Sequence, residues 1–182
     1  PKRMNYLAMQ DHTFPSLHLH FKIRFCIIRC MKITQAFVLA GGKGERLRPL
    51  TDSIPKPLVK VAGKPIMEYS IELLAGHGVR EIILGTGYMH HKMESHFGNG
   101  SKFGVKIKYS FEKEPLGTGG ALKAASAMLD ERFFMVNGDN IADFHLTKMA
   151  KEHFAEKALA TIALTEVDDV SGFGVARVEG KK

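Results

Sequence analysis

Cysteine is nearly missing from this sequence: its 182 residues contain only Cys26 and Cys30, both near the N-terminus. A lone C-x3-C spacing is not a metal-ligand set, so neither a zinc site nor a disulfide framework is expected. Such sparse cysteine is typical of a reduced, cytoplasmic protein. Long apolar runs are missing as well, because Arg24 and Arg29 flank the most apolar stretch of the first 30 residues. With nothing near the roughly 18 residues that span a bilayer, we expect no membrane partner.

Basic residues exceed acidic ones, but the excess is not spread over the chain. Residues 1–30 contain five Lys or Arg side chains and one Asp, which is +4 of the formal net charge of +7. Nucleic-acid binding usually needs a basic face with aromatic or motif support, and the bulk of the chain lacks one. We therefore expect no nucleic-acid partner and look instead to small phosphorylated ligands.

The composition is that of an ordinary globular domain, with 45% apolar and 25% charged residues. Residues 1–30 show neither helical nor strand periodicity, and Met31 begins the regular pattern. We predict that residues 1–30 form a poorly ordered extension and that residues 31–182 form the functional domain.

From Met31 onward, short apolar runs alternate with segments of helical periodicity. Such alternation predicts an α/β sandwich with a mainly parallel sheet. The predicted strands are 34–40, 81–84, 105–109, 133–136, 159–164 and 173–178, and the predicted helices are 65–75, 89–97, 119–129 and 146–157.

Parallel sheets bind ligands at the carboxyl ends of their strands. The turns after Ala40, Leu84, Ser110 and Val136 should therefore line one crevice.

The first of these turns, LAGGKGERLRPLT at residues 39–51, is rich in glycine and cations. Glycines let backbone N–H groups approach a phosphate closely, and Arg46 can bind phosphate oxygens with two hydrogen bonds. It is not a dinucleotide fingerprint, because Leu47 stands where the third glycine would be. Lys56 follows between Pro55 and Pro57, which fix its loop and favour a second phosphate contact.

Two later turns also carry groups suited to a nucleotide. EPLGTGGAL at residues 114–122 places glycines where a flat ligand could approach the backbone at the start of a helix. Asp139 follows a predicted strand and offers a carboxylate to a hard cation such as Mg²⁺, which needs few protein ligands when phosphates are present.

The motif L-A-G-G-x-G-x-R-L-x-P-L-T, followed by P-K-P-L at residues 55–58 and G-K-P at 63–65, resembles the signature of the sugar-1-phosphate nucleotidyltransferases. The likeness extends over about residues 35–178. It implies a Rossmann-like, three-layer α/β/α fold with a mainly parallel (mixed) sheet. It also implies that an NTP and a sugar 1-phosphate react, with Mg²⁺, to give an NDP-sugar and pyrophosphate.

The likeness assigns family roles to matching residues. Arg46 and Lys56 resemble catalytic cations at the triphosphate, and Asp139 resembles the metal ligand. Gly138 and Gly174 match positions that contact the sugar. The residues that match nucleotide-binding positions are Leu39, Gly41, Gly42, Gly44, Glu45, Gly117 and Thr118.

The choice of substrates depends on one short pattern. G-T-x-G-x-L at residues 117–122 is more similar to mannose- or heptose-1-phosphate guanylyltransferases than to thymidylyltransferases. GTP plus mannose 1-phosphate giving GDP-mannose is therefore favoured, while thymidylyl or uridylyl transfer to glucose 1-phosphate stays open.

Two other classes stay open beside the transferase. Family members continue beyond Lys182 into a Glu-Lys-Pro motif and a second metal-binding Asp, so residues 31–182 are expected to be an incomplete domain. A non-catalytic nucleotide- or nucleotide-sugar-binding module is one alternative. A dinucleotide-dependent oxidoreductase is disfavoured by Leu47 and by Leu84-Gly85-Thr86, where a ribose-binding acid would be expected. Formation of a homo-oligomer is also left open.

Overall fold

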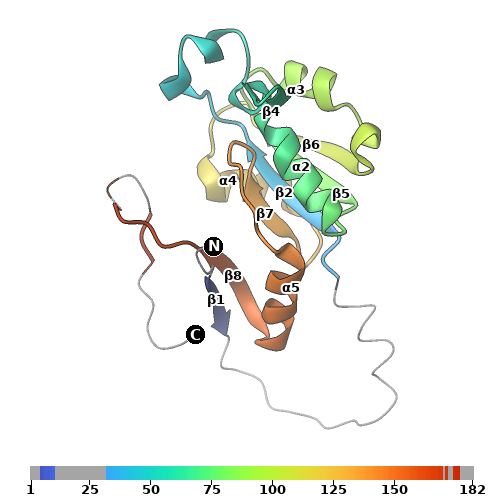
Figure 1. Ribbon diagram of the computed structural model, residues 1–182. Coiled ribbons are helices and arrows are strands. Elements are labelled where there is room, and N and C mark those ends of the chain that lie inside the picture. The colour runs from blue at the N-terminus through green and yellow to red at the C-terminus, as the bar shows by residue number, and fades with distance from the viewer. Residues whose placement is uncertain (1–4, 11–31, 170, 172–173, 177–182) are drawn as a thin grey trace. The chain divides into compact units, whose positions relative to one another are not determined.

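The computed structural model describes residues 5–10, 32–169, 171 and 174–176 (Figure 1). The chain divides into two compact units. The sheet unit is Ile33–Asp143, and the terminal unit combines Pro1–Lys32 with Phe144–Lys182.

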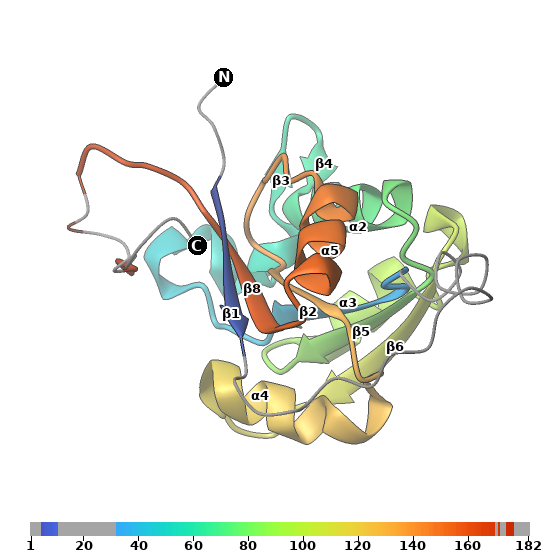
Figure 2. The same cartoon turned by 90° about the horizontal axis from the view of Figure 1, so that it is seen from below.

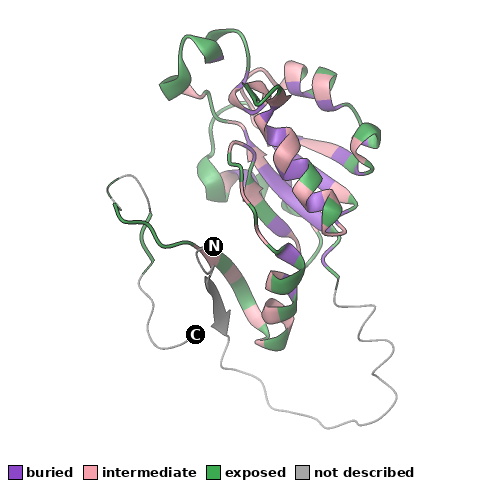
Figure 3. Ribbon diagram, viewed as in Figure 1, coloured by how far each residue is buried: buried purple, intermediate pink, exposed green. Residues whose placement is uncertain are grey.

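The sheet unit is built on a four-stranded, wholly parallel sheet with the strand order β6-β5-β2-β7. Its two central strands are almost continuously buried (Figure 3), because layers cover both faces of a parallel sheet and leave no solvent-facing side. This explains the unbroken apolar runs of the sequence. The strands are β2 (Gln35–Ala40), β5 (Glu81–Thr86), β6 (Lys106–Phe111) and β7 (Phe134–Asn137).

Helices cover both faces of this sheet, with α2 (Ile66–Gly76) on one side and α4 (Gly117–Ala125) on the other (Figure 2). Ala121 and Ala125 of α4 form a buried cluster with Phe37 of β2 and Ile83 of β5. A further helix, α3 (His90–Phe97), follows β5. The predicted α/β class with a parallel central sheet is therefore confirmed.

Short elements complete the sheet unit. The strands β3 (Lys60–Val61) and β4 (Lys64–Pro65), each two residues long, pair antiparallel. Single 3₁₀ turns occupy Glu45–Leu47, Leu50–Asp52, Lys56–Leu58, Ser101–Phe103 and Ser126–Met128.

The terminal unit contains β1 (Asn5–Gln10), α5 (Leu146–Ala155) and β8 (Ala158–Leu164). Strand β1 pairs antiparallel with β8. Its partner lies more than 140 positions away in the sequence, so local periodicity did not indicate this strand. The poorly ordered extension over residues 1–30 stays a prediction. The helix α5 and the strand β8 confirm the patterns at 146–157 and 159–164, and His153 Nδ1 lies 3.0 Å from Thr161 Oγ1 between them.

Two expectations concern the ends of the chain. Most of the strand predicted over 173–178 lies outside the described residues, and residues 174–176 are not in a strand. The domain boundary between residues 30 and 31 stays a prediction. Among the described residues, no helix combines the length and apolar character needed to cross a membrane.

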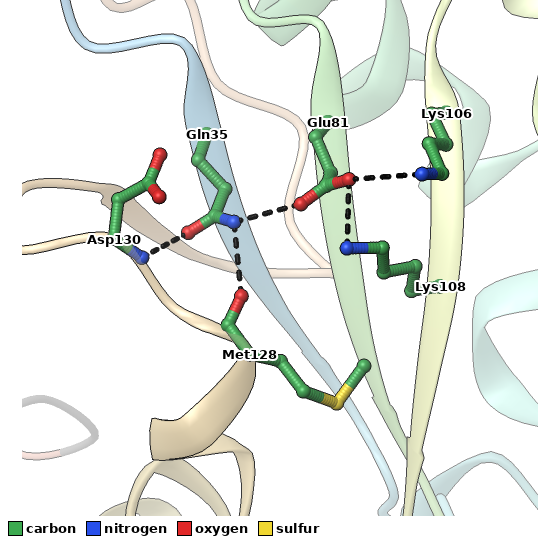
Figure 4. Close-up of polar contacts among 6 residues, drawn as sticks. All are labelled: Gln35, Glu81, Lys106, Lys108, Met128 and Asp130. Carbon is green, nitrogen blue, oxygen red and sulfur yellow. Dashed lines mark hydrogen bonds and ion pairs between the residues drawn. The ribbon is translucent and has the colours of Figure 1, made fainter.

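A buried amide joins the sheet to the segment after α4 at the amino ends of the strands (Figure 4). Gln35, only 3% exposed, donates from Nε2 to Glu81 Oε1 (2.9 Å) and to the Met128 carbonyl (3.0 Å). Its Oε1 accepts the Asp130 N–H at 2.6 Å. Because every polar atom of the amide has a partner, the buried side chain avoids a desolvation penalty and fixes β2 against β5.

The second carboxylate oxygen of Glu81 extends this network to β6. It lies 2.9 Å from Lys108 Nζ and 3.7 Å from Lys106 Nζ. The hydrogen bond from Lys108 is the main cause that holds the pKa of Glu81 below its ordinary value, although partial burial opposes it. The ionised carboxylate is thus more stable in the folded protein than in the unfolded chain.

We predict that this network makes stability pH-dependent. Since the folded pKa of Glu81 is depressed, its contribution is present above the unfolded pKa near 4.5 and is lost as the pH falls through the folded value. At pH 7, Glu81→Gln should lower the free energy of unfolding by about 1 kcal/mol, a figure kept small because the side chain is partly exposed. Urea unfolding at pH 7 and at pH 3 should show the difference shrinking in acid.

The matched control is Glu131→Gln, which removes a carboxylate that is 81% exposed and forms an ion pair with the neighbouring Arg132. It should have little effect at either pH. An equal loss for Glu81→Gln at both pH values would contradict a role for its charge.

Candidate functional site

A cavity of about 740 Å³ lies at the carboxyl edge of the sheet, within the sheet unit. Its walls come from the segments that follow β2, β6 and β7 and from the first turn of α4. The volume falls within the range of small-molecule sites. Most of the residues selected from the sequence line it: Leu39, Gly41, Gly42, Gly44, Glu45, Arg46, Lys56, Gly117, Thr118 and Asp139.

The turn that follows β2 within the motif of residues 39–51, named the glycine turn, requires glycine at one position in particular. Gly44 has a φ of 65°, and an added Cβ would lie 2.9 Å from Lys56 Cβ and 3.0 Å from Thr51 Cγ2. The Thr51 hydroxyl donates to the Gly44 carbonyl at 2.9 Å, which closes the turn. Gly44 therefore lets the glycine turn pack directly against the segment that carries Lys56. Gly42, by contrast, has no atom within 4 Å of an added Cβ.

Lys56 and Asp139 meet across the cavity although 83 positions separate them. The Lys56 ammonium lies 2.5 Å from Asp139 Oδ2, and the side chains are 25% and 34% exposed. Lys56 comes from the 3₁₀ turn after Pro55, and Asp139 comes from the turn after β7. The structure thus brings the glycine turn, the proline-flanked lysine and the acid after β7 to one place.

Gly138, which was selected for sugar contact, does not line the cavity. Gly138 is buried, and its N–H donates to the Leu39 carbonyl at 2.9 Å. A Cβ there would lie 2.9 Å from Met67 Sδ and 3.1 Å from Val38 Cγ1, so close packing between β2 and α2 explains this glycine. Gly174 belongs to the terminal unit. Sugar contact by either residue stays a prediction.

The cavity also contains polar residues that the sequence motifs did not single out, chiefly Glu112 and Asn137. Glu112 follows β6, and its N–H donates to the Thr86 carbonyl at 2.8 Å, which continues the pairing of β5 with β6. Its Oε2 accepts the Leu116 N–H at 3.2 Å. The available signal was position: Glu112 lies in the turn after Ser110, one of the four turns expected to line the crevice.

Helix α4 begins at Gly117, two residues earlier than predicted, and Leu116 precedes its first turn. No side chain caps this end of α4.

The cavity has an oxygen donor for a cation but no preformed metal cage. The Asp139 carboxylate is partly exposed there and is of the kind that Mg²⁺ prefers. In the part of the chain that the structure describes, no three His, Cys, Asp or Glu side chains converge on a common point. Asp139 therefore fits a cation whose remaining ligands come from phosphate oxygens and water.

The sequence model of the nucleotidyl transferase family matches residues 35–182. Over 150 residues the chain is 43% identical to the mannose-1-phosphate guanylyltransferase catalytic subunit beta of Danio rerio, which covers 80% of this chain and 42% of that protein. It is 39% identical over 141 residues to the D-glycero-alpha-D-manno-heptose 1-phosphate guanylyltransferase of Aneurinibacillus thermoaerophilus, covering 77% of this chain and 61% of the relative. The chain thus spans roughly half the length of these relatives.

Comparison with solved structures points to the same family. HddC from Yersinia pseudotuberculosis, crystallised in complex with GMP-PN, superposes with a TM-score of 0.60 and 33% identity, covering 66% of this chain and 54% of HddC. A putative glucose-1-phosphate thymidylyltransferase from Bacillus anthracis gives a TM-score of 0.64 at 28% identity, covering 68% of this chain and 51% of that one. With the family signature, the parallel sheet and the family match in agreement, the chain belongs to the nucleotidyl transferase family.

Proposed function

We propose that this protein transfers a guanylyl group from GTP to a sugar 1-phosphate, with mannose 1-phosphate as the favoured acceptor and GDP-mannose and pyrophosphate as products. The observation that carries the proposal is the single cavity that joins the glycine turn, Arg46, Lys56 and Asp139. The names of the guanylyltransferase relatives and the GMP-PN complex of HddC support guanine as the base.

The reaction is an in-line displacement. An oxygen of the sugar phosphate attacks the α-phosphorus of GTP, the bond from that phosphorus to the bridging oxygen breaks, and pyrophosphate leaves with the bond's electron pair. No proton has to be removed from the nucleophile, because a phosphate oxygen is already anionic. The protein must therefore hold two polyanions together and stabilise charge on the leaving group.

Residues of the cavity suit those tasks. Backbone N–H groups of the glycine turn can donate to phosphate oxygens, and Arg46 can bind them with its planar guanidinium. Lys56 adds a point charge beside Asp139. Asp139 would hold Mg²⁺, which neutralises phosphate charge when it is bound.

The direct test is a screen for pyrophosphate release with each of the four common NTPs, several sugar 1-phosphates and Mg²⁺. We expect release with GTP and mannose 1-phosphate. Asp139→Asn and Arg46→Ala should each lower kcat by about 100-fold or more, as expected when charge stabilisation in the transition state is removed. Circular dichroism should show both variants folded.

Asp143→Asn is the matched control, since it makes the same change at an exposed acid four residues away that does not line the cavity. It should leave turnover unchanged. Full activity of Asp139→Asn would contradict the metal assignment. Nucleotide binding without pyrophosphate release from any pair would contradict catalysis and support a binding module.

A second prediction concerns the packing of the glycine turn. Gly44→Ala places a Cβ 2.9 Å from Lys56 Cβ at a positive φ, so the turn and Lys56 must both shift. We expect a loss of about 1–3 kcal/mol in stability, together with weaker GTP binding. Thermal unfolding and a GTP titration measure the two effects.

Gly76→Ala, in helix α2 with open space at its Cβ position, is the matched glycine substitution. It should leave GTP binding unchanged and should not destabilise the fold. If Gly44→Ala binds GTP as tightly as the unmodified chain, the packing of the glycine turn on Lys56 does not position the nucleotide.

A further inference from the structure

The segment that follows β5 does not take the place that the sequence predicts for it. Four parallel strands end at the same edge of the sheet, yet of the described residues that line the cavity none follows β5. Residues 87–89 lead instead from this strand into helix α3. Because β5 lies between β2 and β6, this segment is close to the cavity wall without being part of it.

The backbone after β5 packs against the beginning of the glycine turn. The Tyr88 N–H donates to the Gly41 carbonyl at 3.3 Å. A Cβ on Gly87 would lie 3.1 Å from the Gly41 carbonyl oxygen and 3.6 Å from Gly41 Cα, so glycine at position 87 permits this close approach. The beginning of the glycine turn is therefore held by the segment after β5.

The side chain of Tyr88 reaches the other end of the same motif. Its hydroxyl donates to the Thr51 carbonyl at 3.3 Å. Thr51 is only 2% exposed, and its own hydroxyl donates to the Gly44 carbonyl at 2.9 Å. Tyr88 thus binds the motif at both Gly41 and Thr51, and the second contact continues through Thr51 to Gly44.

A lysine of α3 adds a third contact to the same stretch of chain. Lys92, near the start of α3, donates from Nζ to the Ser53 carbonyl. Arg46 precedes residues 51–53 in the chain and Lys56 follows them. The contacts from Tyr88 and Lys92 therefore restrain the segment that carries both cations of the cavity wall.

Such restraint matters because this segment has little regular structure of its own. Between residues 41 and 58 it contains only single 3₁₀ turns, at 45–47, 50–52 and 56–58. A site that is in its binding conformation for only part of the time has its affinity reduced by that fraction. Contacts made outside the cavity can therefore strengthen binding without touching the ligand.

We propose that Tyr88 is a positioning residue for the triphosphate: from outside the cavity, it holds the glycine turn and the cations that follow in the conformation that binds the outer two phosphates. The assignment rests on the proposed function, in that a nucleoside triphosphate must occupy the cavity. GTP and GMP share the base, the ribose and the first phosphate. An effect on the outer two phosphates therefore changes the ratio of their affinities.

The test measures binding of GTP and GMP to the 182-residue protein with Mg²⁺ present, by titration calorimetry for GTP and by displacement of GTP for GMP. Tyr88→Phe removes only the hydroxyl that binds Thr51. We expect this variant to bind GTP about 3- to 10-fold more weakly, which corresponds to the net contribution of one hydrogen bond. Its affinity for GMP should stay within about twofold of that of the unmodified protein.

Tyr109→Phe is the matched control, because it makes the same change at a residue that does not line the cavity. The Tyr109 hydroxyl donates to the Gly98 carbonyl at 2.7 Å, a shorter hydrogen bond than that of Tyr88. Both variants should lower the melting temperature by no more than about 4 °C, the shift expected for one hydrogen bond in a protein of this size. Only Tyr88→Phe should change the ratio of GTP to GMP affinity.

The outcomes that contradict the proposal differ in what they overturn. If Tyr88→Phe weakens GTP and GMP binding equally, or weakens neither, Tyr88 does not position the triphosphate, and the proposed function is unaffected. The same change of the affinity ratio in Tyr109→Phe would also overturn the assignment, since it would show a general effect of lost hydroxyls. No binding of either nucleotide by the unmodified protein overturns the proposed function and this assignment with it.

Discussion

The contact between the Lys56 ammonium and the Asp139 carboxylate is the interaction on which the site depends. It joins the chain after the glycine turn to the end of an outer strand, and so closes one side of the cavity. A lysine and an aspartate side by side are also a suitable pair for a polyanion and its cation, because each charge is balanced before the ligand arrives. The tight approach of Gly44 to Lys56 keeps this pair in place.

Side chains of both charges line the cavity. Arg46 follows β2, and Lys56 contacts Asp139 in the turn after β7. Glu112 follows β6 and lies close to Gly41 of the glycine turn. Their convergence follows from strand order, since the chain segments that carry them leave different strands at the same edge of the sheet.

Much of the fold and part of the site were predictable from sequence. The apolar runs around Phe37 and Ile83 predict buried parallel strands because both faces of such strands are covered. The glycine turn, Lys56 and Asp139 could be selected because their spacing carries a chemical signature. Glu112 could not, since a single glutamate after a strand has no signature until the strands are placed side by side. Gly138 shows the opposite case: a glycine next to a functional acid is explained by packing against Met67. Strand β1 depends on a distant partner, which local periodicity does not report.

The Gln35 network lies at the amino ends of the strands, whereas the cavity lies at their carboxyl ends. The contacts that hold the strands together and the residues that line the cavity therefore lie at opposite ends of the sheet. Side chains after β2 or β6 can therefore be exchanged, and the bound ligand changed, without loss of the contacts at the amino ends. Those contacts keep the sheet intact. Relatives named for mannose, heptose and glucose 1-phosphates share similarity with this chain, and the separation of the two rims is a physical basis for that variety.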